Sequence, residues 1–404
     1  MRPNLRRVAA LGAGILLVGA TAFAAAGCGG SSSNANTRTT VSGLPQSIGK
    51  GEGALNLIEW PYYSDKSFAD KFEQQTGCTI RRKDAGSSNQ MVALMRTGGG
   101  GGGGQYDMVS ASGDASLRLI AGGDVRPVNV DLIPAWKDFI PAFQSPAHNT
   151  VGGVHYGVSL QWGPNTLMYN TDKIKPAPKD WSILYEPTYR GQITVPNNPI
   201  QIADAALYLS KTKPSLGITD PYELTQEQFD ATIDLLKQQK PLVKTYWNYA
   251  ADEIQAFAQG DVSVGASWPY QTLQLQAKKL PITEIIPRQG VTGWADTWMV
   301  AKRAPHPNCA YMWMKYVSTP QVQAQQALVF GETPVNPNAC PYMNKLEAGS
   351  CAKYHLNEPE SFYSTIKFWK TPVADCGNSD DSATEDTNCM DYNQWQKSWT
   401  EVTG

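Results

Sequence analysis

Residues 54–81 read ALNLIEWPYYSDKSFADKFEQQTGCTIR. The first segment, Ala54–Trp60, is short and apolar, which is typical of a buried strand. Ser67–Gln75 places two phenylalanines one helical turn apart, and the glycine at position 77 is typical of a helix C-cap. Cys78–Arg81 again has the pattern of a strand. A strand, a helix and a second strand in this order predict a parallel βαβ unit.

The same alternation of strand and helix patterns continues toward the C-terminus, which predicts an α/β fold. His155–Tyr169 is apolar, β-prone and interrupted by Gly-Pro, so we expect it to cross between two lobes. The other predicted strands are Tyr106–Ser110, Gln192–Val195, Val262–Ser267 and Trp298–Ala301. The other predicted helices are Ser88–Thr97, Ala115–Ala121, Gln201–Ser210, Thr225–Leu236 with a capping-box pattern, Asp252–Gln259 and Ala310–Val317.

The N-terminus has the pattern of an export signal. Three arginines precede the apolar run Val8–Ala26, and small residues lead up to Cys28. The sequence Ala25-Ala26-Gly27-Cys28 resembles the bacterial lipobox, in which the cysteine sulfur receives a lipid. We therefore expect residues 1–27 to be a lipoprotein signal peptide and Cys28 to be lipidated, with a plain membrane-spanning anchor as the alternative.

Residues 28–50 are rich in Gly, Ser, Asn and Thr, a composition that predicts a flexible tether. The folded part then begins near Gly51 and is about 350 residues long, which is enough for two lobes. Removal of residues 1–27 takes away three arginines and no acid, so the formal charge changes from −2 to −5. This mildly acidic balance argues against a nucleic-acid partner and favours a cationic ligand.

Six cysteines follow Cys28, and an even number in an exported chain is typical of disulfides. Pairing of sequence neighbours gives Cys340–Cys351 and Cys376–Cys389 and leaves Cys78–Cys309, although fifteen pairings are allowed. Buried free thiols are the alternative. The chain contains no Cys-x-x-Cys spacing and its four histidines are scattered, so no metal site is expected.

The order of the motifs resembles that of the spermidine/putrescine-binding periplasmic proteins of ABC importers, a branch of the type II solute-binding proteins. The resemblance extends from about Leu55 to Asn338. It is carried by IEWPYY (Ile58–Tyr63), YDMVSASGDASLRLIAGGDVRPVN (Tyr106–Asn129), YGVSLQWGPNTLMYNTDKI (Tyr156–Ile174), YRGQITVPNN (Tyr189–Asn198), GDVSVGASW (Gly260–Trp268), IIPRQGVTGWADTWMVAK (Ile285–Lys302) and GETPVNPN (Gly331–Asn338).

The resemblance implies a two-lobed type II periplasmic-binding-protein fold with a ligand cleft between the lobes. Carried over by position, lobe 1 comprises 51–156 with 296–335, and lobe 2 comprises 157–295 with 336–404. It also implies a monomer that binds a small cationic solute without a cofactor and without catalysis, and that closes to be recognised by an ABC permease in the membrane.

A polyamine needs aromatic walls for its methylene groups and carboxylates for its ammonium groups. In the N-terminal part, the resemblance places Trp60, Tyr62, Ser112 and Asp114 in the cleft. Core packing is the alternative role for Trp60. Asp114 is equally well suited to cap the helix that follows it.

Further along, the resemblance places Trp268, Trp294 and Asp296 at the ligand, with Asp296 bound to an amine. In an extended chain, positions 294 and 296 face the same side, so ring and carboxylate can meet one ligand. The alternative role for Asp296 is a cap at the hinge between the lobes.

The sequence departs from the family pattern in the second lobe. Asn197 stands where the family supplies acids, and the first acid there is Asp204, one turn into the next helix. Glu332 stands where the family has a tyrosine and supplies a further carboxylate. Arg288 would suit a ligand carboxylate. The sequence therefore also allows a shorter amine, a betaine-like quaternary ammonium or another cation as the ligand.

A sugar-binding protein of the same fold and a secreted hydrolase are the two alternative functions. A sugar-binding protein of the same fold would also use Trp and Tyr, but it seldom needs a lone carboxylate beside each ring. A secreted hydrolase would need catalytic residues, and the chain contains neither Gly-x-Ser-x-Gly nor His-Glu-x-x-His. We therefore expect a binding protein and not an enzyme.

Overall fold

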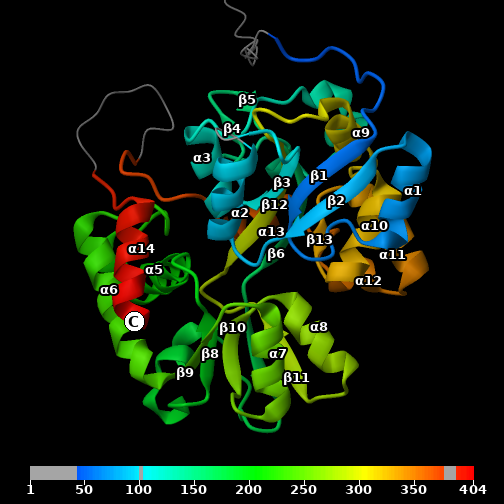
Figure 1. The fold of residues 1–404 in the computed structure, drawn as a ribbon. Coiled ribbons are helices and arrows are strands. Elements are labelled where there is room, and N and C mark those ends of the chain that lie inside the picture. Colours follow the sequence, from blue (N-terminus) through cyan, green and yellow to red (C-terminus); the bar gives the residue numbers. More distant parts are fainter. Residues whose placement is uncertain (1–42, 100–102, 377–387) are drawn as a thin grey trace, which may run out of the picture. The chain divides into compact units, whose positions relative to one another are not determined.

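Two β-sheets, each flanked by helices, organise the chain in the computed structural model, which describes residues 43–99, 103–376 and 388–404 (Figure 1). The predicted signal peptide and Cys28 lie outside the described residues. Within the described ranges, no helix combines the length and the apolar character needed to cross a membrane.

The first sheet has the strand order β13-β6-β12-β3-β1-β2, and β14 pairs with one end of β12. Strand β1 is parallel to β2 and β3, as the βαβ pattern predicts, whereas β12 is antiparallel to β3 and β6. The strands are β1 (Ala54–Glu59), β2 (Thr79–Asp84), β3 (Met108–Ser112), β6 (Val158–Pro164), β12 (Thr292–Val300), β13 (Thr333–Pro334) and β14 (Lys367–Phe368).

The second sheet has the strand order β11-β7-β10-β8-β9. Strand β8 is parallel to β9 and β10, and β7 is antiparallel to β10 and β11. The strands are β7 (Thr166–Asn170), β8 (Ile193–Pro196), β9 (Val243–Trp247), β10 (Val264–Ser267) and β11 (Ile282–Ile285). A short hairpin of β4 (Thr150–Val151) and β5 (Val154–His155) stands apart.

The predicted helices are present, with local caps, whereas α8 and α10–α14 had no counterpart among the predictions. Asp65 accepts a hydrogen bond from the backbone N–H of Ser67 at the start of α1, and Gly77 ends this helix with a left-handed φ of 71°. The predicted capping box of Thr225 and Gln228 is present at the start of α6. The main helices are α1 (Lys66–Thr76), α2 (Ser88–Leu94), α3 (Gly113–Ala121), α5 (Gln201–Thr212), α6 (Gln226–Gln239), α7 (Ala250–Gln259), α8 (Pro269–Ala277), α9 (Pro307–Val317), α10 (Pro320–Phe330), α11 (Cys340–Leu346), α12 (Ser350–Lys353), α13 (Glu360–Thr365) and α14 (Tyr392–Thr403).

The chain passes from the first sheet to the second at Asn165, between β6 and β7, and returns between β11 and β12. The two crossing segments are joined there, because the Asn165 backbone N–H donates to the Thr292 carbonyl over 2.8 Å. The Asn165 side chain donates to the Thr292 hydroxyl over 2.7 Å. The expected crossing within His155–Tyr169 is therefore present, as two strands in different sheets.

The strand pairing moves the predicted boundaries between the lobes. We expected 157–295 in lobe 2, yet β6 lies in the first sheet, and so does β12 from Thr292 onward. The reason is the antiparallel ladder of these two strands, which runs from Gly293 opposite Pro164 to Trp298 opposite Val158. We also expected 336–404 in lobe 2, whereas β14 pairs with β12 in the first sheet.

All three disulfides join the cysteines that the pairing of sequence neighbours suggested. Cys78–Cys309 links the residue before β2 to α9, Cys340–Cys351 links α11 to α12, and Cys376–Cys389 lies in the C-terminal segment. Helix α11 packs against α10, which in turn contacts β6 and β13 of the first sheet. The expectation that Cys340 and Cys351 belong to lobe 2 is therefore wrong, because their helices pack beside the first sheet.

We predict that the three bridges differ in their contribution to stability. Cys78–Cys309 spans 231 residues and Cys340–Cys351 spans 11. In the loop-entropy account, the longer loop restricts the unfolded chain more, by about 2–3 kcal/mol. The double variant C78S/C309S should therefore lose that much more unfolding free energy in urea than the matched variant C340S/C351S. Equal losses would contradict the prediction.

Candidate functional site

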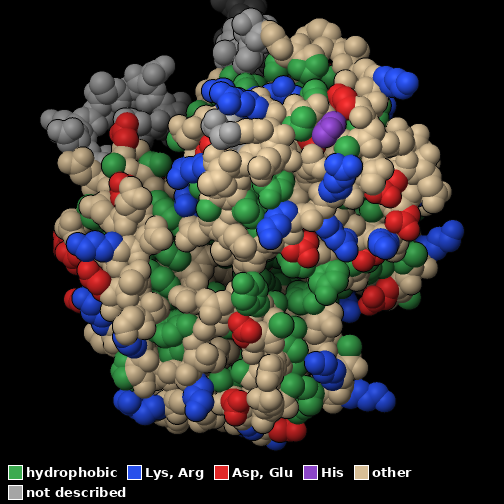
Figure 2. All heavy atoms as spheres, viewed as in Figure 1, with side chains coloured by type: hydrophobic (Ala, Val, Ile, Leu, Met, Phe, Trp, Pro, Cys, Tyr) green, Lys and Arg blue, Asp and Glu red, His purple; other side chains and the backbone are tan. Residues whose placement is uncertain are grey.

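A cavity of about 450 Å³ lies between the two sheets and takes its lining from both. On the second-sheet side, Asn197, Trp247 and Trp268 come at or just after the ends of β8, β9 and β10. On the first-sheet side, Trp60 and Ser112 occupy the equivalent positions at β1 and β3. The carboxyl ends of parallel strands are the usual place for ligands in α/β sheets. Figure 2 shows hydrophobic side chains gathered along the middle of this face.

The walls of the cavity are largely aromatic. The ring of Trp268 lies 4.8 Å from that of Trp247 and 6.4 Å from those of Trp294 and Trp369. Gly163 faces Trp294 in the β6–β12 ladder, and a Cβ atom at this glycine would lie only 2.2 Å from the indole. The glycine thus leaves the room that the Trp294 ring occupies.

A cluster of buried acids occupies the first-sheet end of the cavity. The Ser112 hydroxyl donates to Asp296 Oδ1 over 2.5 Å, and the Tyr63 hydroxyl is hydrogen-bonded to Asp296 Oδ2. The same Tyr63 oxygen lies 2.9 and 3.1 Å from the two carboxylate oxygens of Glu332. Burial raises the pKa of Asp296 to about 7 and holds the pKa of Glu332 well above its usual range.

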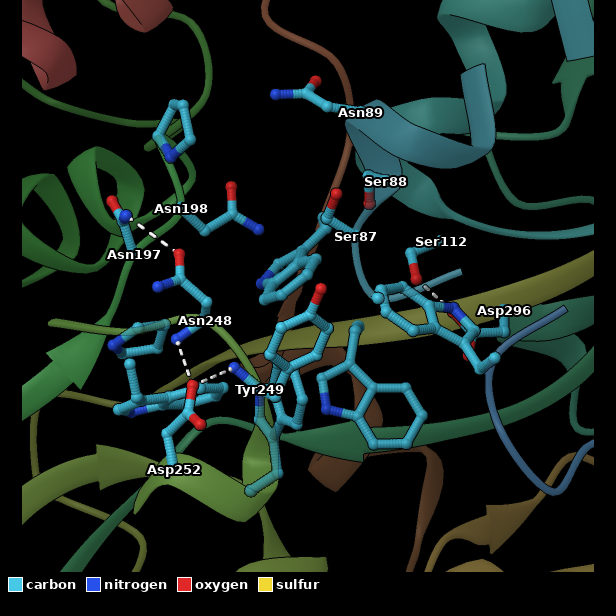
Figure 3. A pocket seen from close by; sticks show the side chains of 18 of the residues that line it. Ser87, Ser88, Asn89, Ser112, Asn197, Asn198, Asn248, Tyr249, Asp252 and Asp296 are labelled. Carbon is cyan, nitrogen blue, oxygen red and sulfur yellow. Dashed lines mark hydrogen bonds between the residues drawn. The ribbon is translucent and has the colours of Figure 1, made fainter. Parts of the chain in front are cut away.

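Amides and a third acid occupy the second-sheet end (Figure 3). Asp252, in the first turn of α7, accepts the backbone N–H groups of Asn248 and Tyr249 over 3.2 and 2.9 Å. The Asn197 amide donates to Asn248 Oδ1 over 3.0 Å, and its own oxygen accepts from the indole N–H of Trp399 over 2.9 Å. These bonds fix the amide orientations, so the site is organised before a ligand enters.

The structure brings seven of the nine predicted ligand residues to the cavity: Trp60, Ser112, Asn197, Trp268, Trp294, Asp296 and Glu332. Trp294 and Asp296 line it together, as the period of an extended strand predicts. No Lys, Arg or His stands among the lining residues of the described chain. The charge of the cavity is therefore set by its carboxylates and favours a cation.

Two predicted residues, Tyr62 and Asp114, do not line the cavity. Tyr62 has a left-handed φ of 75° and is 52% exposed, so the turn sends its ring to solvent and presents Tyr63 to the cavity instead. Asp114 is buried in the first turn of α3, where it accepts the Ser88 hydroxyl over 2.8 Å. Its carboxyl lies beneath the site and not in its wall.

Asp204 and Arg288, which the sequence suggested as further charged groups near the ligand, do not line the cavity. Asp204 is partly buried; it accepts hydrogen bonds from Asn165 and Thr292, and removal from water raises its pKa to about 6. Asn165 in turn accepts the indole N–H of Trp268 over 3.1 Å, so this network supports the aromatic wall. Arg288 is 70% exposed and pairs with Asp180 over 2.6 Å, outside the cavity.

The lining residues that were not predicted from the sequence include Tyr63, Trp247, Asp252, Trp369 and Tyr392. Alternating side chains in Val243–Trp247 were a signal for the strand that ends in Trp247. Trp369 and Tyr392 lie in the C-terminal segment, beyond the part of the chain on which the family resemblance was built. No local pattern indicated that this segment returns to the cleft.

The C-terminal segment connects both sides of the cavity. The Trp369 backbone N–H donates to Gly293 in the first sheet, and that of Met390 donates to Leu224 beside α6. The Tyr392 hydroxyl then donates to Asn89 over 3.0 Å, and Arg118 lies 4.2 Å from the centre of the Tyr392 ring. In Figure 1, α14 (red) lies beside α6. Trp395 and Trp399 of α14 belong to one hydrophobic core with buried residues of α5 and α6.

Comparison with known proteins finds a match to a family described as bacterial extracellular solute-binding protein over residues 67–347. A putrescine/agmatine-binding protein of Pseudomonas aeruginosa is 22% identical over 310 residues, which cover 72% of this chain and 81% of that protein. Spermidine/putrescine-binding periplasmic protein 1 of Haemophilus influenzae is 20% identical over 340 residues, covering 82% and 88%.

Among solved structures, the Tp0655 (TpPotD) lipoprotein of Treponema pallidum superimposes with a TM-score of 0.66 at 19% identity, covering 86% of this chain and 99% of that one. At this identity, the likeness establishes the fold, which is the two-lobed α/β fold of periplasmic binding proteins. It is the fold expected from the sequence.

We predict that the Asp296 carboxyl makes the stability of the ligand-free protein pH-dependent. The pKa of Asp296 in the folded protein is raised to about 7, so the protonated carboxyl favours the folded state at low pH. This stabilisation is lost as the pH rises toward and through 7. Asp296→Asn does not titrate, so between pH 5 and pH 8 it should gain about 2 kcal/mol relative to the wild type. Urea unfolding at both pH values measures this, and a pH-independent difference would contradict it.

Proposed function

The chain belongs to the family of bacterial extracellular solute-binding proteins, and we propose that it captures a small organic polycation of the putrescine or spermidine class for an ABC importer. Family membership makes it an exported binding protein for a small solute, which works with a membrane permease and is not an enzyme. The identity of the solute is the part that the proposal adds.

One observation carries the proposal: the cavity combines indole walls with three carboxylates and has no basic side chain among its described lining residues. The ring faces attract ammonium groups by about 0.5–2 kcal/mol each, and they also cover the methylene groups between the charges. Hydrogen bonds from ammonium to carboxylate are charge-assisted and stronger than neutral ones. A neutral sugar would leave the acids Asp296 and Glu332 without a compensating charge.

The placement of the acids favours a ligand with more than one positive charge. Asp296 lies at the first-sheet end of the cavity and Asp252 at the second-sheet end (Figure 3). Glu332 lies beside Asp296, since both are hydrogen-bonded to the Tyr63 hydroxyl. Asp252 uses part of its acceptor capacity on two backbone N–H groups, and a carboxylate offers about four lone-pair sites. A diamine can therefore place one ammonium at each end, with its methylene chain against the tryptophans.

The lobes are proposed to follow the strand pairing. Lobe 1 comprises 51–164 with 292–371, and lobe 2 comprises 166–285 with the C-terminal helix from Tyr392. A ligand that contacts both lobes binds the closed arrangement more tightly than the open one and so shifts the protein toward closure. The closed surface is then what the permease recognises.

The protein is further proposed to be a monomer held at the outer face of the cell membrane by lipid on Cys28. The support is the sequence pattern Ala25-Ala26-Gly27-Cys28 followed by a Gly/Ser-rich tether. A single anchored domain on a tether of about 20 residues can still reach a permease in the same membrane.

We predict that Cys28→Ser abolishes labelling of the protein by a radioactive fatty acid. Without the sulfur there is no site for the lipid. Cleavage at the lipobox follows lipidation, so the variant is expected to keep its apolar run Val8–Ala26, and fatty-acid labelling rather than membrane residence is the deciding measurement. A wild-type protein that stays in the membrane fraction without taking up the label would support the spanning-anchor alternative and contradict lipidation.

We predict that putrescine or spermidine at micromolar concentration raises the melting temperature of the protein. A ligand at 100 times its Kd stabilises the folded state by about 2.7 kcal/mol, which corresponds to several degrees for a chain of this size. Asp296→Ala should weaken binding by about 30-fold or more, because it removes a buried charged partner. Calorimetric titration gives the Kd values.

The matched control is Asp180→Ala, which removes an acid of a surface ion pair outside the cavity and should leave the Kd unchanged. A panel that includes glycine betaine and maltose separates the alternatives. Stabilisation by a sugar or by a quaternary amine alone would overturn the polyamine proposal, and so would an Asp296→Ala variant that binds putrescine as well as the wild type.

A further inference from the structure

The Tyr63 hydroxyl joins two carboxyl groups, and no Lys, Arg or His stands beside them among the described lining residues of the cavity. This hydroxyl is hydrogen-bonded to Asp296 on β12 and to Glu332 after α10, and all three side chains are at most 2% exposed. Glu332 is placed there by the turn after α10, where Gly331 has a left-handed φ of 80° and the Glu332 backbone N–H donates to Ala327.

The number of hydrogens in this cluster implies a carboxyl proton. A tyrosine hydroxyl carries one hydrogen, and an ionised carboxylate can only accept. If Tyr63 donates to one of the two acids, its oxygen must accept from the other, and an acid donates only when it is protonated. This geometry is therefore satisfied when the Asp296–Glu332 pair keeps one proton.

The surroundings of the pair favour the same state. From β3, Ser112 donates to Asp296, and from α3 the carboxyl of Asp114 adds a further negative group, itself faced by Arg118. From β6, the polar side chain of Gln161 stands opposite Asp296 in the ladder. Burial raises the pKa of both acids, and repulsion adds to it, from Asp296 at Glu332 and from Asp114 at Asp296. No Lys, Arg or His lines the described cavity to offset this.

We propose that the ammonium group of the ligand replaces this proton, so that the protein exchanges a carboxyl proton for an alkylammonium ion with N–H hydrogens. The inference rests on the proposed function and narrows its substrate class to primary or secondary amines. On binding, the O–H bond of the protonated acid breaks and its proton passes to the solvent. The ammonium then donates N–H hydrogen bonds to both carboxylates, and Tyr63 keeps its own hydrogen.

A quaternary ammonium fits this exchange poorly. It carries a positive charge but no hydrogen to donate, so both carboxylates would be left buried with unfilled acceptor sites. Such groups are costly when they are removed from water. The acid pair thus distinguishes N–H cations from permethylated ones of the same charge and length.

The test is calorimetric titration of the purified protein with putrescine at pH 6 in buffers of different ionisation enthalpy. The slope of observed heat against buffer enthalpy gives the number of protons released, and we expect about one or more per putrescine. Release of one proton also means that the Kd improves by up to tenfold for each pH unit from 5 to 6.

Two variants locate the source of the proton. Glu332→Gln can donate to Tyr63 without titrating, so proton release should fall by about one. The matched control is Glu253→Gln, which makes the same change at a buried acid that accepts the Ser267 hydroxyl outside the cavity and should release as the wild type does. If Glu332→Gln does not fold, the wild-type buffer series alone still decides the proposal.

A third arm uses the putrescine analogue in which both nitrogens are permethylated, for which we expect binding at least tenfold weaker. Binding of putrescine with no proton release would overturn this inference and leave the proposed function standing. Equal affinity for the analogue would overturn the preference for N–H cations. Failure of putrescine, spermidine and agmatine to bind at all would overturn both this inference and the proposed function.

Discussion

Strand β12 holds the site and the fold together, because it pairs with β3 on one side and β6 on the other. Within this ladder, Asp296 stands opposite both Ser112 and Gln161, and the register shifts directly after it. Such irregularities re-aim side chains next to functional sites. The regular part of the strand before the shift keeps Trp294 and Asp296 on the same face, toward the cavity.

This arrangement buries Asp296 and Glu332 without a basic side chain among the described residues that line the cavity. Removing a carboxylate from water costs several kcal/mol when nothing compensates its charge. The hydroxyls of Ser112 and Tyr63 reduce that cost, as does the proton that we propose the acid pair retains. A cationic ligand offsets the cost of burying the carboxylates more completely than a proton does. The buried acids therefore favour the binding of positively charged ligands over neutral ones.

The C-terminal segment adds a third connection between the two sides of the cleft. It contributes Trp369 from beside the first sheet and Tyr392 from the start of α14, and both line the cavity. Because α14 is anchored by Trp395 and Trp399 in the core of α5 and α6, Tyr392 links that core to Asn89 on α2. Any change in the separation of the two sheets must therefore also move or break this contact.

The sequence by itself determined what depends on neighbours along the chain. Local periodicity and spacing predicted the alternation of strands and helices, the caps at Gly77 and Thr225, and the shared face of Trp294 and Asp296. Spacing also suggested the pairing of nearby cysteines, which is one of the fifteen pairings that six cysteines allow. Tertiary structure alone decided which distant groups meet, as when Tyr63 meets Glu332 across 269 residues. It also decided, through one left-handed turn, that Tyr63 and not Tyr62 faces the cavity. Local sequence patterns do not predict these long-range contacts, because such contacts depend on the strand order and on where the chain crosses between the sheets.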